Sequence, residues 1–182
     1  MVRTLVFVTF GFLLTACHGT AVRPEPPHSV ADFRTINIGD SCEAVPAREE
    51  ALASTAVPWQ GPKDIYAFRG YDFGRDLLFS YLCPAGDLFA GNYYFPEEQP
   101  DGVIGTYHDV HRRLVSLYGK PFADSSDLQA DPRFRASESR RYMTTWWTPR
   151  LSITMAVMPN FPTEPQGLRV FVVIARRLGG AK

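Results

Sequence analysis

The sequence has no excess of charge, few cysteines and no long apolar run, and each shortage narrows the possible functions. Its 182 residues include 19 basic and 19 acidic side chains, so overall charge favours no partner of either sign. Twenty consecutive apolar residues occur nowhere, which argues against a membrane-spanning helix. The motifs Gly-x-Ser-x-Gly and His-Glu-x-x-His and a phosphate-binding glycine loop are also missing. We therefore predict no catalytic residues, no cofactor and no enzymatic activity.

The first seventeen residues carry the most specific pattern in the chain. Arg3 precedes the run LVFVTFGFLL at residues 5–14, which is followed by Leu14-Thr15-Ala16-Cys17. Ten residues suit the apolar region of a signal peptide and are too few to cross a bilayer. The pattern resembles the lipobox of bacterial lipoproteins, which implies that residues 1–16 are removed and that Cys17 receives a diacylglyceryl group. The alternative is an ordinary secretory signal with an accidental cysteine.

The resemblance also implies a location in the cell envelope. Asp after the lipidated cysteine favours the inner membrane in that family, and His18 stands there instead. We expect a protein anchored by lipid in the outer membrane and facing the periplasm. Residues 17–35 are rich in proline and poor in large apolar groups, which predicts a tether. Residues 36–182 are expected to form a single periplasmic domain.

Two cysteines remain once Cys17 is assigned to the lipid. An even pair in an oxidising compartment predicts one disulfide, between Cys42 and Cys83. Two free buried thiols are the alternative. The chain contains no Cys-x-x-Cys spacing, which argues against a redox site.

The pattern of apolar residues predicts an α+β domain with two similar halves. The first half would begin with a helix capped by Asp40 and Glu43, or with one that starts near Pro46 and runs to Ser54. A second helix is expected at 103–118, ended by Gly119. Three strand-like runs follow each helix, at residues 65–69, 76–83, 88–95, 142–147, 151–157 and 168–177. This order predicts tandem helix–three-strand units, with one antiparallel sheet and both helices packed on one face.

Short motifs in these units resemble two known groups of envelope or inhibitor domains. Ile38-Gly39-Asp40-Ser41 and Tyr118-Gly119-Lys120-Pro121 are similar to the helix starts and stops of BamE-like (SmpA/OmlA) lipoproteins and of β-lactamase-inhibitor-like folds. That resemblance implies a domain that binds proteins. The stretch at 81–88 also resembles the opening of membrane-bound lysozyme inhibitors, although 137–142 lacks the glycine of their inhibitory segment.

The only cluster that suggests a metal is His108-Asp109-x-His111 in the second expected helix. Both imidazoles fall on the flank of its apolar stripe, and the sequence supplies no third ligand near them. We predict solvated or hydrogen-bonded histidines and no metal site.

Charge is divided unevenly along the chain and points to a binding face. Residues 133–182 contain nine basic and two acidic residues, whereas 17–132 contain nine basic and seventeen acidic ones. The two halves would either neutralise each other or provide a basic surface for an anionic partner. Because Trp146 and Trp147 are adjacent in a strand, they should point to opposite faces. We predict a binding face that combines one tryptophan with four arginines of a long loop, Arg133, Arg135, Arg140 and Arg141.

Together these features predict a non-enzymatic, lipid-anchored protein-binding or scaffold module. Its expected partners are the membrane, through the lipid, and an unknown envelope or periplasmic protein, with no nucleic acid. The alternative is an inhibitor or immunity lipoprotein that blocks a toxin or a lytic hydrolase.

Overall fold

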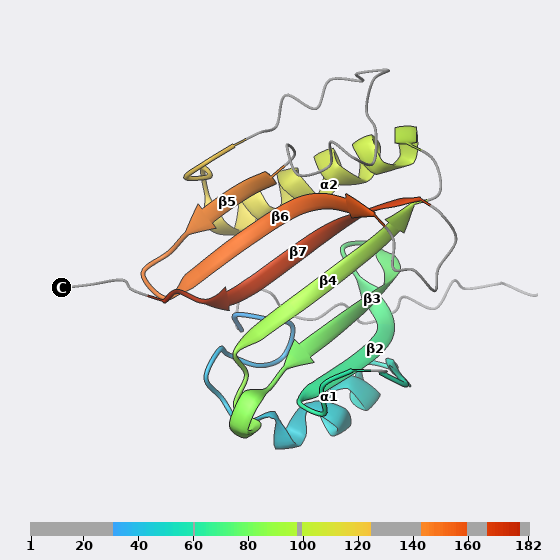
Figure 1. Ribbon diagram of the computed structural model, residues 1–182, viewed down its shortest axis with the longest axis vertical. Helices are drawn as coiled ribbons and strands as arrows, with labels where there is room; N and C mark the ends of the chain where they lie inside the picture. The colour runs from blue at the N-terminus through green and yellow to red at the C-terminus, as the bar shows by residue number, and fades with distance from the viewer. Residues whose placement is uncertain (1–30, 60, 98–99, 125–142, 160–166, 179–182) are drawn as a thin grey trace, which may run out of the picture.

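Seven antiparallel strands form one sheet, in the order β1-β2-β3-β4-β7-β6-β5 (Figure 1). The computed structural model describes residues 31–59, 61–97, 100–124, 143–159 and 167–178. The strands are β1 (Thr55–Val57), β2 (Ile65–Asp72), β3 (Arg75–Leu82), β4 (Ala90–Glu97), β5 (Met143–Trp147), β6 (Leu151–Pro159) and β7 (Leu168–Arg176). The antiparallel sheet confirms the α+β class, although sheet dominates the fold.

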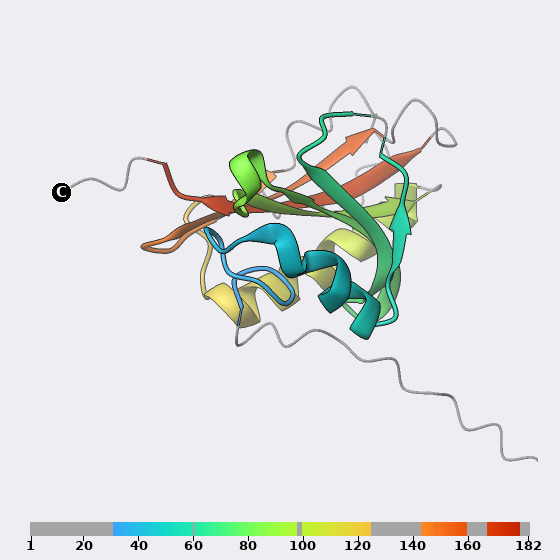
Figure 2. The same ribbon diagram turned by 90° about the horizontal axis from the view of Figure 1, so that it is seen from below.

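Both α-helices lie on the same side of the sheet, as the edge-on view shows (Figure 2). They are α1 (Val45–Ala51), which follows the short 3-10 helix η1 (Cys42–Ala44), and α2 (Pro100–Tyr118). The expected apolar stripe of α2 is buried at Val103, Tyr107, Val110 and Leu114. No helix in the described part of the chain is long and apolar enough to cross a membrane.

Strand alternation divides the sheet into a core face and an open face. On β4, Tyr93 and Phe95 join the hydrophobic core beneath the helices, and Tyr94 lies on the opposite face. β7 lies between β4 and β6, so its central position agrees with its dense β-branched sequence. On the open face of β7, Phe171 remains half-buried. The sheet therefore has one fully covered face and one that is only partly covered.

The folded domain starts earlier than the sequence predicted. Phe33 and Arg34, which were assigned to the tether, are fully buried. They belong to a tight turn in which Phe33 and Ile36 exchange backbone hydrogen bonds of 3.0 Å. The ring of Phe33 lies directly on Gly91 of β4, where an added Cβ would stand 2.2 Å from ring carbons. This buried turn was not predicted, because the residues that precede it are polar and rich in proline.

The start of the first helix also differs from the prediction. Ser41, and not Asp40, caps η1, because its hydroxyl accepts a hydrogen bond from the backbone N–H of Glu43. The carboxylate of Asp40 instead bonds to Asn37. Pro46 stands in the first turn of α1, where its missing N–H costs nothing. The helix ends at Ala51, three residues before the predicted end.

Strand β1 was not predicted from the sequence, and the first helix is therefore followed by four strands and not three. Its three residues are too few to show a period of two, and β1 lies at the edge of the sheet, where little is buried. The other strand ends agree with the prediction or differ from it by one to three residues. The second helix begins at Pro100 and ends at Tyr118, and Gly119 follows with a left-handed φ of 77° as its terminator.

Candidate binding surfaces

Among the predicted site residues, the structure describes the cysteine pair and the two tryptophans. The Sγ atoms of Cys42 and Cys83 lie 1.99 Å apart, at disulfide distance, and link η1 to the end of β3. Cys17 and the four arginines at 133, 135, 140 and 141 lie outside the described residues. The two adjacent tryptophans are described, and they separate as the strand geometry requires.

Trp146 and Trp147 point to opposite faces of β5, and only one reaches solvent. Trp146 is 1% exposed and donates a hydrogen bond of 2.9 Å from Nε1 to the carbonyl of Gly119. Trp147 is 48% exposed. Trp146 therefore holds the end of α2 against β5, and Trp147 is the tryptophan available to a partner.

Trp147 is part of an exposed stack of two aromatic rings and one cation. The ring of Phe122, itself 67% exposed, lies 3.9 Å from that of Trp147 at an interplanar angle of 15°. The Arg177 guanidinium lies 5.0 Å from the centre of the Trp147 ring. Arg177 also donates a hydrogen bond of 3.2 Å to the carbonyl of Thr148. The stack is therefore fixed in place by the backbone of the β5–β6 turn.

Polar contacts on the core side of β5 fix the segment that carries Phe122. The hydroxyls of Tyr107 and Thr144 share a hydrogen bond of 2.5 Å, and Thr144 donates one of 3.1 Å to Asp124. On the backbone, Phe122 and Ala123 both donate to the carbonyl of Thr145. Burial raises the pKa of Tyr107 to about 12, which keeps its hydroxyl protonated as a donor. This network explains why an exposed phenylalanine holds one position.

Two further basic residues are close in the chain to the residues of this stack. Lys120 and Arg150 are exposed, and Leu178, at the end of the described chain, adds a further apolar side chain. We use the name Trp147 surface for Lys120, Phe122, Trp147, Arg150, Arg177 and Leu178. The chain that carries the four predicted arginines leaves after Asp124 and returns at Met143, so both ends of that segment lie beside β5.

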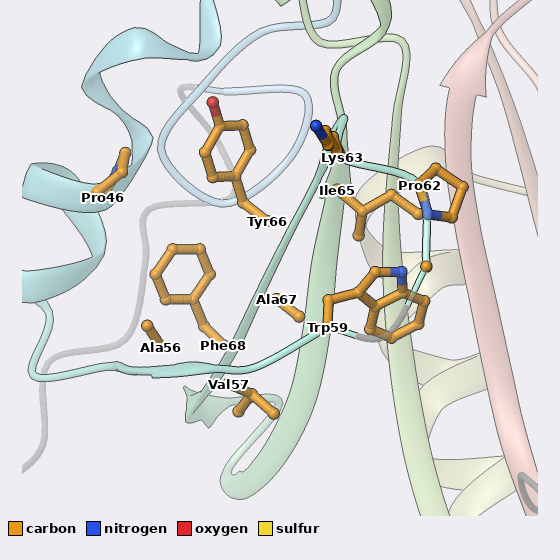
Figure 3. A pocket seen from close by; sticks show the side chains of 11 residues that line it. Pro46, Ala56, Val57, Trp59, Pro62, Lys63, Ile65, Tyr66, Ala67 and Phe68 are labelled. Carbon is orange, nitrogen blue, oxygen red and sulfur yellow. The ribbon is translucent and has the colours of Figure 1, made fainter.

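A pocket of about 360 Å³ opens at the other edge of the sheet, between β1, β2 and α1 (Figure 3). Its volume lies within the range of small ligand sites. We use the name Trp59 pocket for it, and the lining residues used below are Pro46, Val57, Trp59, Pro62, Lys63 and Tyr66. In Figure 3, Trp59 and Pro62 lie on one side of the pocket and Tyr66 on the side nearer Pro46.

Local packing fixes the position of the Trp59 indole and leaves a concave surface at the edge of the sheet. A Cβ at Gly61 would stand 2.4 Å from Nε1 of Trp59, so the ring lies against a bare backbone. Tyr66 is 38% exposed although it belongs to a strand. A second hollow of about 330 Å³ is lined by Thr55 of β1 and Arg69 of β2 together with Asp76 of β3 and Pro96 of β4. The edge formed by β1 and β2 is therefore concave.

The sequence did not single out Phe122, Arg177, Trp59 or Tyr66. Phe122 follows a helix stop, and Trp59 lies in a loop rich in proline and glycine, so periodicity marks neither residue. A large aromatic residue next to Pro or Gly, outside any predicted element, was the available indication. Arg177 was predicted only as the last residue of a strand and as one of the basic residues of the C-terminal part.

His111 of α2 lies between Asp124 and Trp146. His111 is half-buried, and its Nε2 lies 3.5 Å from Oδ2 of Asp124, an ion pair only when the imidazole is protonated. Its ring lies 5.5 Å from that of Trp146. Among the described residues, no group of three or more His, Cys, Asp or Glu side chains is arranged to hold a metal ion.

Comparison with protein-family models, with curated proteins and with solved structures finds no significant match to this chain.

Proposed function

We propose that this protein is a non-enzymatic, lipid-anchored module of the bacterial envelope that binds another protein in the periplasm. The lipobox pattern at residues 14–17 supports the anchor. The Trp59 pocket supports the binding role and is the single observation that carries it. Outer-membrane attachment, with the domain facing the periplasm, completes the proposal.

The chemistry of the Trp59 pocket fits an extended protein segment. Edge strands offer backbone hydrogen-bonding groups to an added strand, and neighbouring pockets then select its side chains. β1 is the edge strand beside this pocket, and Trp59, Tyr66 and two prolines supply rigid apolar walls. Lys63 adds one cation to the lining. The favoured partner segment therefore carries a large apolar side chain with an acidic residue close to it.

The tandem arrangement of helix and strands belongs to the same proposal. Each half consists of a helix followed by antiparallel strands that join a common sheet. This layout supports kinship with BamE-like or β-lactamase-inhibitor-like domains, which bind proteins. An inhibitor or immunity lipoprotein directed at a toxin or hydrolase is the second candidate, and the concave edge with its aromatic walls suits that role as well.

Membrane fractionation tests the anchor. Cys17→Ala should release the domain from membranes, because it removes the thiol that would carry the lipid, and the melting temperature should stay unchanged. The intact mass of the wild-type N-terminal peptide should show diacylglyceryl modification. An unmodified Cys17, or a variant that stays in the membrane fraction, would refute the anchor.

Photo-crosslinking in living cells tests the binding role. A photoreactive amino acid at position 66, in the Trp59 pocket, should give a discrete protein adduct that Trp59→Ala reduces at least several-fold. The same amino acid at exposed position 105 on α2 is the control. Envelope-assembly proteins in the adduct would support the scaffold role, and a secreted lytic enzyme would support the inhibitor role. Equal adducts from both positions would contradict binding at this pocket.

A further inference from the structure

The Trp147 surface has the composition of a membrane-contacting surface and lies where the chain leaves the domain. We propose that it rests on the anionic headgroup layer of the membrane into which the Cys17 lipid inserts. This inference rests on the proposed lipid anchor and extends it, because it assigns an orientation to the domain.

The apolar part of this surface fits the interfacial zone of a bilayer. Tryptophan is enriched at the level of lipid headgroups, where its ring is buried and its N–H stays hydrated. Trp147 and Phe122 present two exposed, stacked rings, and Leu178 is 75% exposed beside the same turn. These side chains come from three different parts of the chain, and no extended helix is needed to present them.

The charged part fits anionic lipids. Lys120, Arg150 and Arg177 provide three cations, of which Arg150 is compensated by Asp32. Of the neighbouring carboxylates, Asp32 already pairs with Arg150 at 2.9 Å, and Asp124 lies beside His111. Each basic residue near an anionic leaflet increases the partitioning of the protein onto the membrane about five-fold. Phosphate and carboxylate groups on lipids therefore match what the surface offers.

The start of the folded chain lies beside this same surface. Asp32, the second described residue, accepts a hydrogen bond from Arg150 in the β5–β6 turn. Burial and the negative charge of Asp32 together raise the pKa of Tyr118 at the end of α2 to about 12. Figure 2 shows the described chain beginning beside that end of α2. A tether from Cys17 to Asp32 can extend to at most about 50 Å, and it starts from the proposed contact.

The surface is also held rigidly enough to act as a unit. The N–H of Arg177 donates to the carbonyl of Arg150 at 2.9 Å, so the end of β7 is joined to the β5–β6 turn. The N–H of Phe122 donates to the carbonyl of Thr145 at 2.8 Å. Little conformational entropy is therefore lost when the rings and cations contact a bilayer.

Quenching of tryptophan fluorescence by brominated lipids tests the orientation. The full lipidated protein would be reconstituted in vesicles of brominated phosphatidylcholine and phosphatidylglycerol. We expect quenching that Trp147→Phe removes and that Trp59→Phe, at the opposite sheet edge, leaves in place. Loss with Trp59→Phe, or quenching that survives Trp147→Phe, would overturn the proposal.

A second experiment separates this inference from the anchor. The full chain with Cys17→Ser carries no lipid, and its quenching on phosphatidylglycerol vesicles should still fall on Trp147→Phe and in high salt. Lys120→Ser with Arg177→Ser should weaken the contact roughly 25-fold. If Cys17 proves unmodified but this quenching persists, the anchor is wrong and the membrane surface stands. If quenching is absent and a photoreactive group at position 147 captures a protein, the surface belongs to a protein partner.

Discussion

The guanidinium of Arg34 and the carboxylate of Glu49 are joined by two parallel hydrogen bonds of 2.9 Å, and both side chains are fully buried. Burial alone would lower the pKa of Arg34, but the bonds and the charge of Glu49 outweigh burial and raise it. Asp72 accepts a further bond of 2.8 Å from Arg34. Tyr81 and Ser54 both donate to Glu49. This cluster fixes the first turn of the domain to α1 and to β2.

Breaking this pair should cost far more than its surface counterparts. Glu49→Gln removes the charge that compensates Arg34 in a water-free site, so we expect a loss of about 3–5 kcal/mol in the free energy of unfolding. Glu50→Gln changes the exposed neighbour on the same helix and should cost well under 1 kcal/mol. Urea unfolding of both variants measures the difference. Equal losses would mean that the buried pair contributes nothing specific.

Two glycines should respond to alanine with opposite signs. Gly91→Ala places a Cβ 2.2 Å from the Phe33 ring. Displacing that ring should lower the free energy of unfolding by about 1–3 kcal/mol. Gly105→Ala lies on an exposed position of α2 with no atom within 4 Å, and should stabilise by up to about 1 kcal/mol. Thermal unfolding of the two variants is the measurement. A neutral Gly91→Ala would show that Phe33 does not pack on β4.

The cysteine pair should be oxidised in protein exported to the periplasm. A bond between Cys42 and Cys83, 41 positions apart, would contribute about 4 kcal/mol if it acts by restricting the unfolded chain. Intact mass before and after alkylation, with and without reductant, counts the free thiols. Replacing both cysteines by alanine should lower the unfolding free energy by a similar amount. Two alkylated thiols in unreduced protein would refute the disulfide.

Stability should fall in alkali because native tyrosines keep their protons. Tyr118 has a pKa of about 12 when folded and near 10 when unfolded, so the unfolded state releases its proton first. The stabilisation that this proton provides is complete below pH 10 and is lost as the pH rises to 12. The loss in the free energy of unfolding amounts to roughly 1 kcal/mol at pH 11. Tyr118→Phe should flatten this slope in denaturant titrations at pH 8 and 11. An unchanged slope in Tyr118→Phe would contradict this assignment.

The four arginines remain a prediction about binding. The sequence predicts an exposed loop for Arg133, Arg135, Arg140 and Arg141, and exposed charges contribute little to stability, so changing all four to serine should leave the melting temperature almost unchanged. Partner capture and its sensitivity to salt should both decrease. Pull-down of the partner identified by crosslinking, without crosslinking and at two salt concentrations, measures both effects. Equal recovery from both proteins would place binding elsewhere, with the Trp59 pocket as the next surface to vary.

The sequence predicted those parts of the fold that repeat a period over several turns or strand residues. The stripe from Val103 to Leu114 gave α2, and the alternation of Leu151, Ile153, Met155 and Val157 gave β6, because burial on one face leaves a regular trace. β1 and the Phe33 turn left no such trace. One is too short, and the other follows a proline-rich segment and is buried through a tertiary contact with Gly91.

The same distinction explains what could be predicted about the sites. Adjacent residues in a strand must face opposite ways, so the separation of Trp146 from Trp147 followed from local geometry. Which of the two is buried depends on the carbonyl of Gly119, a contact across 27 positions. The pairing of Phe122 with Trp147 and of Asp32 with Arg150 likewise depends on the assembled sheet. Local patterns cannot specify such contacts.

The order of the strands gives the two surfaces a fixed separation. β1 borders the Trp59 pocket and β5 carries Trp147, so the whole width of the sheet lies between them. Seven strands at their usual spacing measure roughly 30 Å across. If the Trp147 surface lies on the bilayer, the sheet acts as a spacer that holds the pocket well above the headgroups. A partner segment would then bind in the aqueous periplasm. Its distance from the membrane would be set by the number of strands and not by the length of the tether.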